Sequence, residues 1–132
     1  MNHDSQKREP RHPAIRVMMM PRDTNALGTI FGGVILSYID QAGAVEAHRF
    51  VKGRLLTVAL HEVEFHDPVF VGDLVSFYAE KLRIGRTSIT IKVVVEGEHR
   101  LRGGDVVKVT EAEVVYVHVD EDNRPQPIAT DD

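Results

Sequence analysis

The chain is organised around residues 23–40, which have the sequence DTNALGTIFGGVILSYID. This segment begins as a polar loop, passes through three glycines and enters an apolar stretch that ends at Asp40. The apolar stretch predicts a helix, and the glycines before it predict a tight turn. We therefore expect a loop that leads into the N-terminus of a buried helix, with the rest of the chain wrapped around that helix.

Outside this segment the pattern changes from helix to strand. The helix is expected to cover residues 32–52, with Gly53 as its C-terminal cap. Alternating and β-branched residues predict one strand before the helix and four after it. With a single helix for five strands, most connections are hairpins, so we expect an α+β fold with an antiparallel sheet curved around the helix. The predicted strands cover residues 14–20, 55–65, 74–84, 87–96 and 106–119.

Length and composition predict a single domain. The 132 residues are 42% hydrophobic, which is enough for a core of ordinary size. We expect a flexible N-terminal tail at residues 1–13, the domain at 14–120 and a C-terminal tail at 121–132.

Charge and cysteine content exclude several classes of function. The net charge of −4 argues against nucleic acid as a partner, because phosphate binding requires a basic surface. The chain has no cysteine, which excludes disulfides and thiol catalysis. It has neither an apolar run long enough to span a membrane nor a secretory signal, so we expect no membrane partner and a cytoplasmic location.

Asp40 is the most unusual residue of the predicted helix. An acid next to an apolar stretch costs free energy unless it is solvated or serves a function. Small residues three and four positions away, Gly43 and Ala44, leave space beside it for a close approach. A solvated surface acid remains the alternative, since most acids are exposed.

Gly32 and Gly33 stand where the helix begins. Glycine at this point lets a ligand approach the free backbone N–H groups of the first turn, which favour an oxyanion. The alternative is a tight turn that needs glycine only for its dihedral angles. Gly33 and Asp40 are about 10 Å apart along a helix, so they cannot both reach one carbonyl carbon. If both act on one substrate, they belong to two copies of the chain, and we predict a two-fold dimer.

The spacing of Asn25, Gly28, the Phe31-Gly32-Gly33 run and Asp40 resembles that of the hotdog-fold acyl-CoA thioesterases. The resemblance is to the branch of bacterial acyl-CoA hydrolases and cytosolic long-chain enzymes. Two further segments, FHDPVFVGD at 65–73 and GRTS at 85–88, resemble turns of the same family. The resemblance covers about residues 14–120 and implies the hotdog fold, a five-stranded antiparallel sheet wrapped around one long central helix.

The resemblance implies hydrolysis of an acyl-CoA thioester to CoA and a carboxylic acid, with no cofactor because CoA is part of the substrate. Asp40 would be the nucleophile or general base, a backbone N–H at Gly33 would polarise the thioester carbonyl, and Asn25 would position water or substrate. The family also implies CoA at a dimer interface and a trimer of dimers. Substrate contacts are expected from Gly28, Phe31, Gly32, Phe65, Pro68, Arg86, Thr87 and Ser88.

One position departs from the family pattern. Relatives often carry an acid or an amide three residues before the glycine pair, where this chain has Thr29, which argues against a second polar catalytic group there. Two alternatives on the same fold remain open: a non-catalytic acyl-CoA binding or sensing protein, and a dehydratase, whose chemistry generally needs a histidine beside the acid. A metal site is not expected, because His61 and His66 face opposite ways on the predicted strand.

Overall fold

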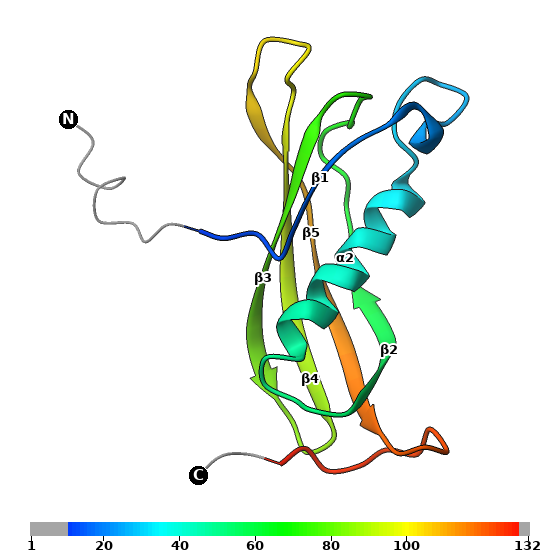
Figure 1. The fold of residues 1–132 in the computed structure, drawn as a ribbon, viewed down its shortest axis with the longest axis vertical. Coiled ribbons are helices and arrows are strands. Elements are labelled where there is room, and N and C mark those ends of the chain that lie inside the picture. Colours follow the sequence, from blue (N-terminus) through cyan, green and yellow to red (C-terminus); the bar gives the residue numbers. More distant parts are fainter. Residues whose placement is uncertain (1–10, 130–132) are drawn as a thin grey trace, which may run out of the picture.

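In the computed structural model, which describes residues 11–129, five strands form one sheet that curves around one long helix (Figure 1). The strand order in the sheet is β1-β3-β4-β5-β2, and every pairing is antiparallel. The predicted α+β architecture is therefore confirmed. The elements in chain order are β1 (Ile15–Met18), the 3₁₀ turn η1 (Pro21–Asp23), α2 (Gly32–Ala47), β2 (Arg54–His61), β3 (Leu74–Ile84), β4 (Ser88–Glu98) and β5 (Val106–Val119).

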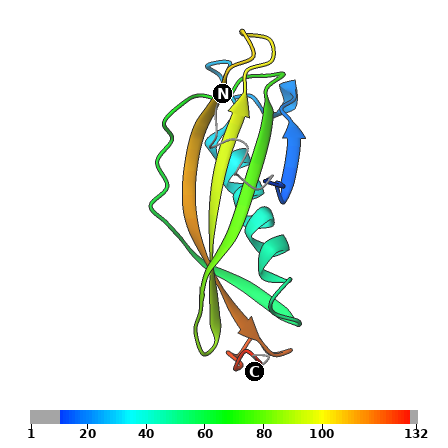
Figure 2. The ribbon, with the colours of Figure 1, turned by 90° about the vertical axis from the view of Figure 1, so that its left-hand side faces the viewer.

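The core lies between α2 and the inner face of the sheet. Figure 2 shows from the side how the helix lies along the sheet. The helix packs against β3, β4 and β5. Ile35 and Ile39 of α2 are buried, and they meet side chains that alternate along each strand, so that one face of the sheet is apolar. On β4 this inner face consists of Ile89, Ile91, Val93 and Val95.

The helix is shorter than the sequence predicted, because it ends at Ala47 and not at residue 52. The backbone N–H groups of Phe50 and Val51 both donate to the carbonyl oxygen of Ala47, each at 3.0 Å, so the chain tightens into a turn. This turn carries Val51 into the core. Gly53 is therefore not the helix cap. It precedes β2 with a φ of 113°, where a Cβ would lie only 2.8 Å from the Nε2 of His118.

Strand β2 is also shorter than predicted and ends at His61. Glu62 has a φ of 58°, a left-handed conformation from which an extended strand cannot continue. His66 consequently does not share a strand with His61, and the prediction that these two histidines lie on opposite faces of one strand is wrong.

A β-bulge interrupts the pairing of β2 with β5 at Val58. Thr57 lies opposite Tyr116 before the bulge, and Leu60 lies opposite Val114 after it. A regular ladder counted back from Leu60 would have placed Val58 opposite Tyr116. The bulge thus exchanges an apolar side chain for a hydroxyl on the side of β2 that faces the helix.

The chain after β5 runs along the end of the sheet that carries the turn between β3 and β4. The backbone N–H of Ile128 donates to the carbonyl oxygen of Arg86 at 2.8 Å, and the Ile128 side chain packs into the core. Of the two tails expected from the sequence, residues 1–10 and 130–132 lie outside the described residues. Between residues 11 and 129, no helix has the length and apolar character needed to cross a membrane.

Candidate active site

Asp40 lies half-buried in the middle of α2 and is held by two hydroxyl groups from the sheet. The hydroxyl of Thr57 on β2 donates to the carboxylate oxygen Oδ1 at 2.6 Å. The hydroxyl of Tyr116 on β5 donates to the backbone carbonyl oxygen of the same aspartate, also at 2.6 Å. Within residues 11–129, the second carboxylate oxygen, Oδ2, has no hydrogen-bond donor. The arrangement is that of an oriented acid with one oxygen open to a ligand.

The space predicted beside Asp40 is filled by a side chain of the same chain. Gly43 is buried, and a Cβ there would overlap the hydroxyl of Tyr116 and lie 3.1 Å from its ring carbon Cζ. Burial, and then the charge of Asp40, raise the pKa of Tyr116 well above its ordinary value of 10.0. The Tyr116 hydroxyl therefore stays protonated at neutral pH and acts as a donor.

Sequence reasoning did not identify Thr57 or Tyr116. The small residues Gly43 and Ala44 were the local signal that something approaches the helix at this turn. The bulge that selects Thr57 has no signature in the sequence of β2, whose residues are ordinary strand formers.

Asn25 holds the loop before the helix. Its side-chain oxygen Oδ1 accepts hydrogen bonds from the backbone N–H groups of Leu27 at 2.9 Å and Thr29 at 3.2 Å. Its amide nitrogen Nδ2 donates to the hydroxyl of Thr29 at 2.9 Å. The turn passes through Gly28, whose φ of 87° favours glycine. An amide group has two hydrogens, so one remains for an acceptor outside this loop.

The N-terminus of α2 is open on its outer side. Phe31 occupies the position before the first helical residue, and its side chain does not cap the helix. Gly33 is exposed, and a Cβ placed on it would meet no atom within 4 Å. The ring of Phe65 lies over Gly32, 3.5 Å from where a Cβ would be. The first turn of the helix thus has backbone N–H groups without intrahelical acceptors, and the exposed ring of Phe65 lies beside it.

The loop before α2 and the connection between β2 and β3 run side by side at this end. Ile30 donates its backbone N–H to the carbonyl oxygen of Val69 at 2.8 Å, and Thr29 forms an isolated bridge with Phe70. The structure thereby brings together seven of the predicted site residues: Asn25, Gly28, Phe31, Gly32, Gly33, Phe65 and Pro68.

The GRTS segment lies at the opposite end of the sheet, in and after the turn between β3 and β4 (Figure 1). Its backbone is pinned there, since the carbonyl oxygen of Thr87 accepts from the N–H of His118 at 2.8 Å. The 16 residues of α2 span about 24 Å between the two ends. Within one chain, Arg86, Thr87 and Ser88 therefore do not join the residues at the helix start.

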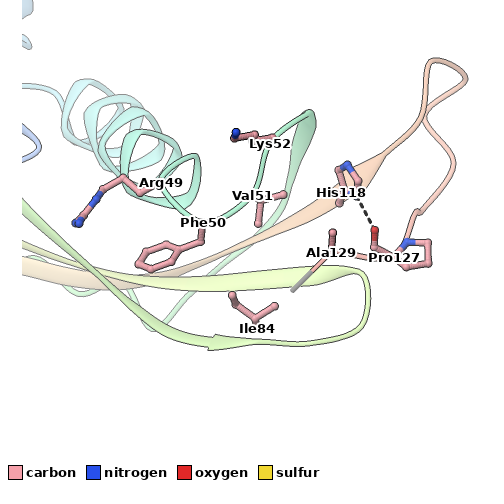
Figure 3. A pocket seen from close by; sticks show the side chains of 8 residues that line it. All are labelled: Arg49, Phe50, Val51, Lys52, Ile84, His118, Pro127 and Ala129. Atoms are coloured by element: carbon pink, nitrogen blue, oxygen red, sulfur yellow. Dashed lines mark hydrogen bonds between the residues drawn. The ribbon is translucent and has the colours of Figure 1, made fainter. Parts of the chain in front are cut away.

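A cavity of about 530 Å³ opens at this second end, beside the C-terminus of α2 (Figure 3). Phe50, Val51 and Ile84 give it an apolar wall, and Arg49, Lys52 and His118 bring cationic or ionisable groups to it. Arg49 also pairs with Glu46 at 3.2 Å. The remaining lining residues are Pro127 and Ala129. A cavity of this composition suits a ligand that carries both phosphate and an apolar ring.

Among the described residues, no three histidine, aspartate or glutamate side chains are grouped so that they could hold a metal ion. No histidine of this part of the chain hydrogen-bonds to Asp40. Within residues 11–129, Asp40 is therefore held by hydroxyl groups and has no histidine partner, whereas the pair of His99 with Asp73 involves a different acid.

Comparison with known proteins gives consistent matches. Residues 27–103 match the Thioesterase superfamily. An acyl-CoA thioester hydrolase of Zymomonas mobilis, itself uncharacterized, is 44% identical over 114 residues, which cover 86% of this chain and 75% of the relative. The acyl-CoA thioester hydrolase YciA of Salmonella typhimurium is 41% identical over 116 residues, which cover 86% of this chain and 87% of the relative. The crystal structure of HI0827, a hexameric broad specificity acyl-coenzyme A thioesterase, matches with a TM-score of 0.87 and 38% identity, over 96% of this chain and 86% of that one.

Proposed function

The chain belongs to the hotdog-fold acyl-CoA thioester hydrolases, and we propose that it cleaves its substrate in sites shared between two copies of the chain. The protein is an acyl-CoA thioesterase that releases CoA and a carboxylic acid. The family, the hotdog fold and the activity expected from the sequence are thereby confirmed. The site residues and the manner in which they combine remain proposals.

One observation carries the shared site: Gly33 and Asp40 both lie in α2. Seven residues of helix separate them by about 10 Å along the axis, and reacting groups must lie within about 3 Å of the same atom. A site that uses both groups therefore combines Asp40 of one subunit with the partner subunit's Gly33. A two-fold axis produces this combination twice.

The edge of the sheet supports such a pairing. Strand β2 is bonded to β5 on one side and is the last strand of the sheet on the other. Leu56 and Val58 on this strand are 40% and 56% exposed, which is high for large apolar side chains on a sheet edge. We propose that β2 faces the second copy, and that three such dimers form the hexamer, as HI0827 is hexameric.

In the proposed mechanism the free oxygen Oδ2 of Asp40 either attacks the thioester carbonyl carbon or removes a proton from the attacking water. The backbone N–H of the partner subunit's Gly33 stabilises the negative charge that develops on the carbonyl oxygen. Either route forms a C–O bond and breaks the C–S bond. Water supplies the oxygen and hydrogen of the acid group and the proton of the CoA thiol.

We assign the two ends of the molecule to different parts of the substrate. Phe31, Phe65 and Pro68 offer apolar contact near the helix start, where Gly28 and Asn25 shape the loop. Arg86, with Thr87 and Ser88, lies at the end that carries the cationic cavity, so we assign this end to the phosphates of CoA. We also propose a cytoplasmic location, which cell fractionation with an antibody to the protein would test.

The test is Asp40→Asn, measured by thiol release from a panel of acyl-CoAs. The amide keeps the size of the side chain but cannot act as a base or a nucleophile, so turnover should fall roughly 100-fold or more while acyl-CoA still binds. Asp122→Asn, at an exposed acid of the C-terminal segment, serves as the matched control and should retain full turnover. Wild-type turnover in Asp40→Asn would remove this residue from the mechanism.

A further inference from the structure

Tyr116 carries a hydroxyl group that the core does not need. The side chain is 1% exposed, and a phenylalanine would fill the same space without burying a polar atom. Its acceptor, the carbonyl oxygen of Asp40, lies in the interior of α2, where the backbone N–H of Ala44 is the regular helical donor. The tyrosine therefore adds a second donor to a carbonyl that the helix itself satisfies.

The helix makes room for this contact at a cost. Gly43 lies one turn after Asp40, and any side chain there would overlap the Tyr116 hydroxyl. Glycine in a helix interior is unfavourable compared with alanine. A buried hydroxyl and a mid-helix glycine are both disadvantageous by themselves, and the two meet at the turn that bears the acid.

We propose that Tyr116 is a positioning residue for thioester hydrolysis, which fixes the helical turn of Asp40 against the sheet and so sets the distance of its carboxylate from the substrate. This inference rests on the proposed role of Asp40. Tyr116 touches the backbone of Asp40, whereas Thr57 touches its carboxylate, so the two hydroxyl groups restrain different degrees of freedom. Tyr116 and Thr57 lie directly opposite each other on neighbouring strands, so the sheet presents both to the same turn.

The hydroxyl is suited to this task over the working range of pH. Burial keeps it protonated, as described above for its raised pKa, so its hydrogen bond to the Asp40 carbonyl does not titrate near neutrality. A positioning contact of this kind changes the rate of the chemical step and leaves substrate binding unaffected, because Tyr116 lies under the helix and is shielded from ligands.

The experiment is Tyr116→Phe, which removes only the hydroxyl, assayed by thiol release below the melting temperature of every variant. We expect kcat to fall on the order of tenfold with KM unchanged. Tyr78→Phe is the matched control. Tyr78 follows the buried Phe77 on β3 and points to the outer face of the sheet, so kcat should stay at the wild-type value.

A second variant makes the outcome independent of any general loss of stability. Gly43→Ala pushes the tyrosine hydroxyl away from the helix, so it should lower kcat in the wild type and lower it less in the Tyr116→Phe background. Additive losses in this double-mutant cycle, a wild-type kcat in Tyr116→Phe, or a change confined to KM would each overturn the positioning role.

The underlying role of Asp40 is checked in the same series. If Asp40→Asn abolishes turnover while Tyr116→Phe leaves kcat intact, the positioning role is overturned and the proposed mechanism stands. If Asp40→Asn itself retains turnover, the proposed mechanism and the inference that rests on it are both overturned.

Discussion

Individual acids of this chain differ in how they are held. Asp73 is fully buried, with Oδ2 bonded to the backbone N–H of Phe70 at 2.9 Å and paired with His99 at 2.7 Å. Its Oδ1 is buried and lacks a partner among the described residues. Asp40 is half-buried and has one oxygen engaged and one open. Asp73 ties a loop to the sheet, whereas Asp40 alone of the two is placed to meet a ligand.

The raised pKa of Tyr116 predicts that the protein becomes less stable at high pH. Its pKa is raised in the folded protein, so above pH 10 or so the unfolded chain loses this proton while the folded chain keeps it. The contribution of Tyr116 to the free energy of unfolding is therefore complete below about pH 10 and declines as the pH rises further. Urea denaturation between about pH 8 and 11 should show a decline that is steeper in the wild type than in Tyr116→Phe. Parallel curves for the two proteins would contradict this assignment.

At the level of elements, the loop from residue 25 to residue 29 is stabilised chiefly by one side chain. Asn25 closes the turn by accepting two backbone hydrogen bonds and donating one to Thr29. Thr29, where the resemblance to the family leads us to expect an acid or an amide, thus carries a hydroxyl that Asn25 binds. This gives Thr29 a structural partner inside the loop.

Two substitutions separate the structural role of Asn25 from a catalytic one. Asn25→Ala removes all three hydrogen bonds and should lower both turnover and the free energy of unfolding, the latter by about 1 kcal/mol. Asn25→Asp keeps the oxygen that accepts from Leu27 and Thr29 but loses the amide hydrogens. If the main role of Asn25 is to hold the loop in place, the aspartate variant should retain more turnover than the alanine variant in the thiol-release assay. Equal losses would instead indicate that an amide hydrogen contacts substrate or water.

For the whole molecule, the arrangement of α2 within the sheet decides how many subunits a site needs. The predicted substrate contacts lie at two ends of a helix about 24 Å long, with Asp40 between them. No bending of a 16-residue helix packed on three strands would bring these ends together. The assembly, and not the single chain, is therefore the catalytic unit in the mechanism proposed here.

Subunit mixing tests this conclusion directly. Asp40→Asn and Gly33→Pro should each be inactive, the second because proline has no backbone N–H at the first turn of the helix. Co-expression of the two, with separate affinity tags, should restore activity in purified hybrids, since each hybrid dimer contains one site with both wild-type groups. Hybrids as inactive as their parents would show that the two groups do not combine across subunits. The control is co-expression of Asp40→Asn carrying one tag with Asp40→Asn carrying the other, and these assemblies should stay inactive.

The sequence by itself determined the class of fold, the order of the helix and the strands along the chain, and the family. These rest on local signals: the period of apolar residues, the glycines of residues 28–33 and the run from Asn25 to Asp40. The same helical arithmetic predicted that Gly33 and Asp40 cannot share a substrate within one chain. Each of these inferences needs only distances along the chain, which secondary structure converts into distances in space.

Only the tertiary structure decided which side chains hold Asp40, where α2 ends and where β2 stops. Thr57 and Tyr116 reach the acid because a bulge sets the register of β2 against β5, and register depends on contacts between distant segments. The helix ends at Ala47, and the turn that follows it carries Val51 into the core. Such outcomes follow from burial and pairing across the whole sheet, for which the local sequence carries no signal.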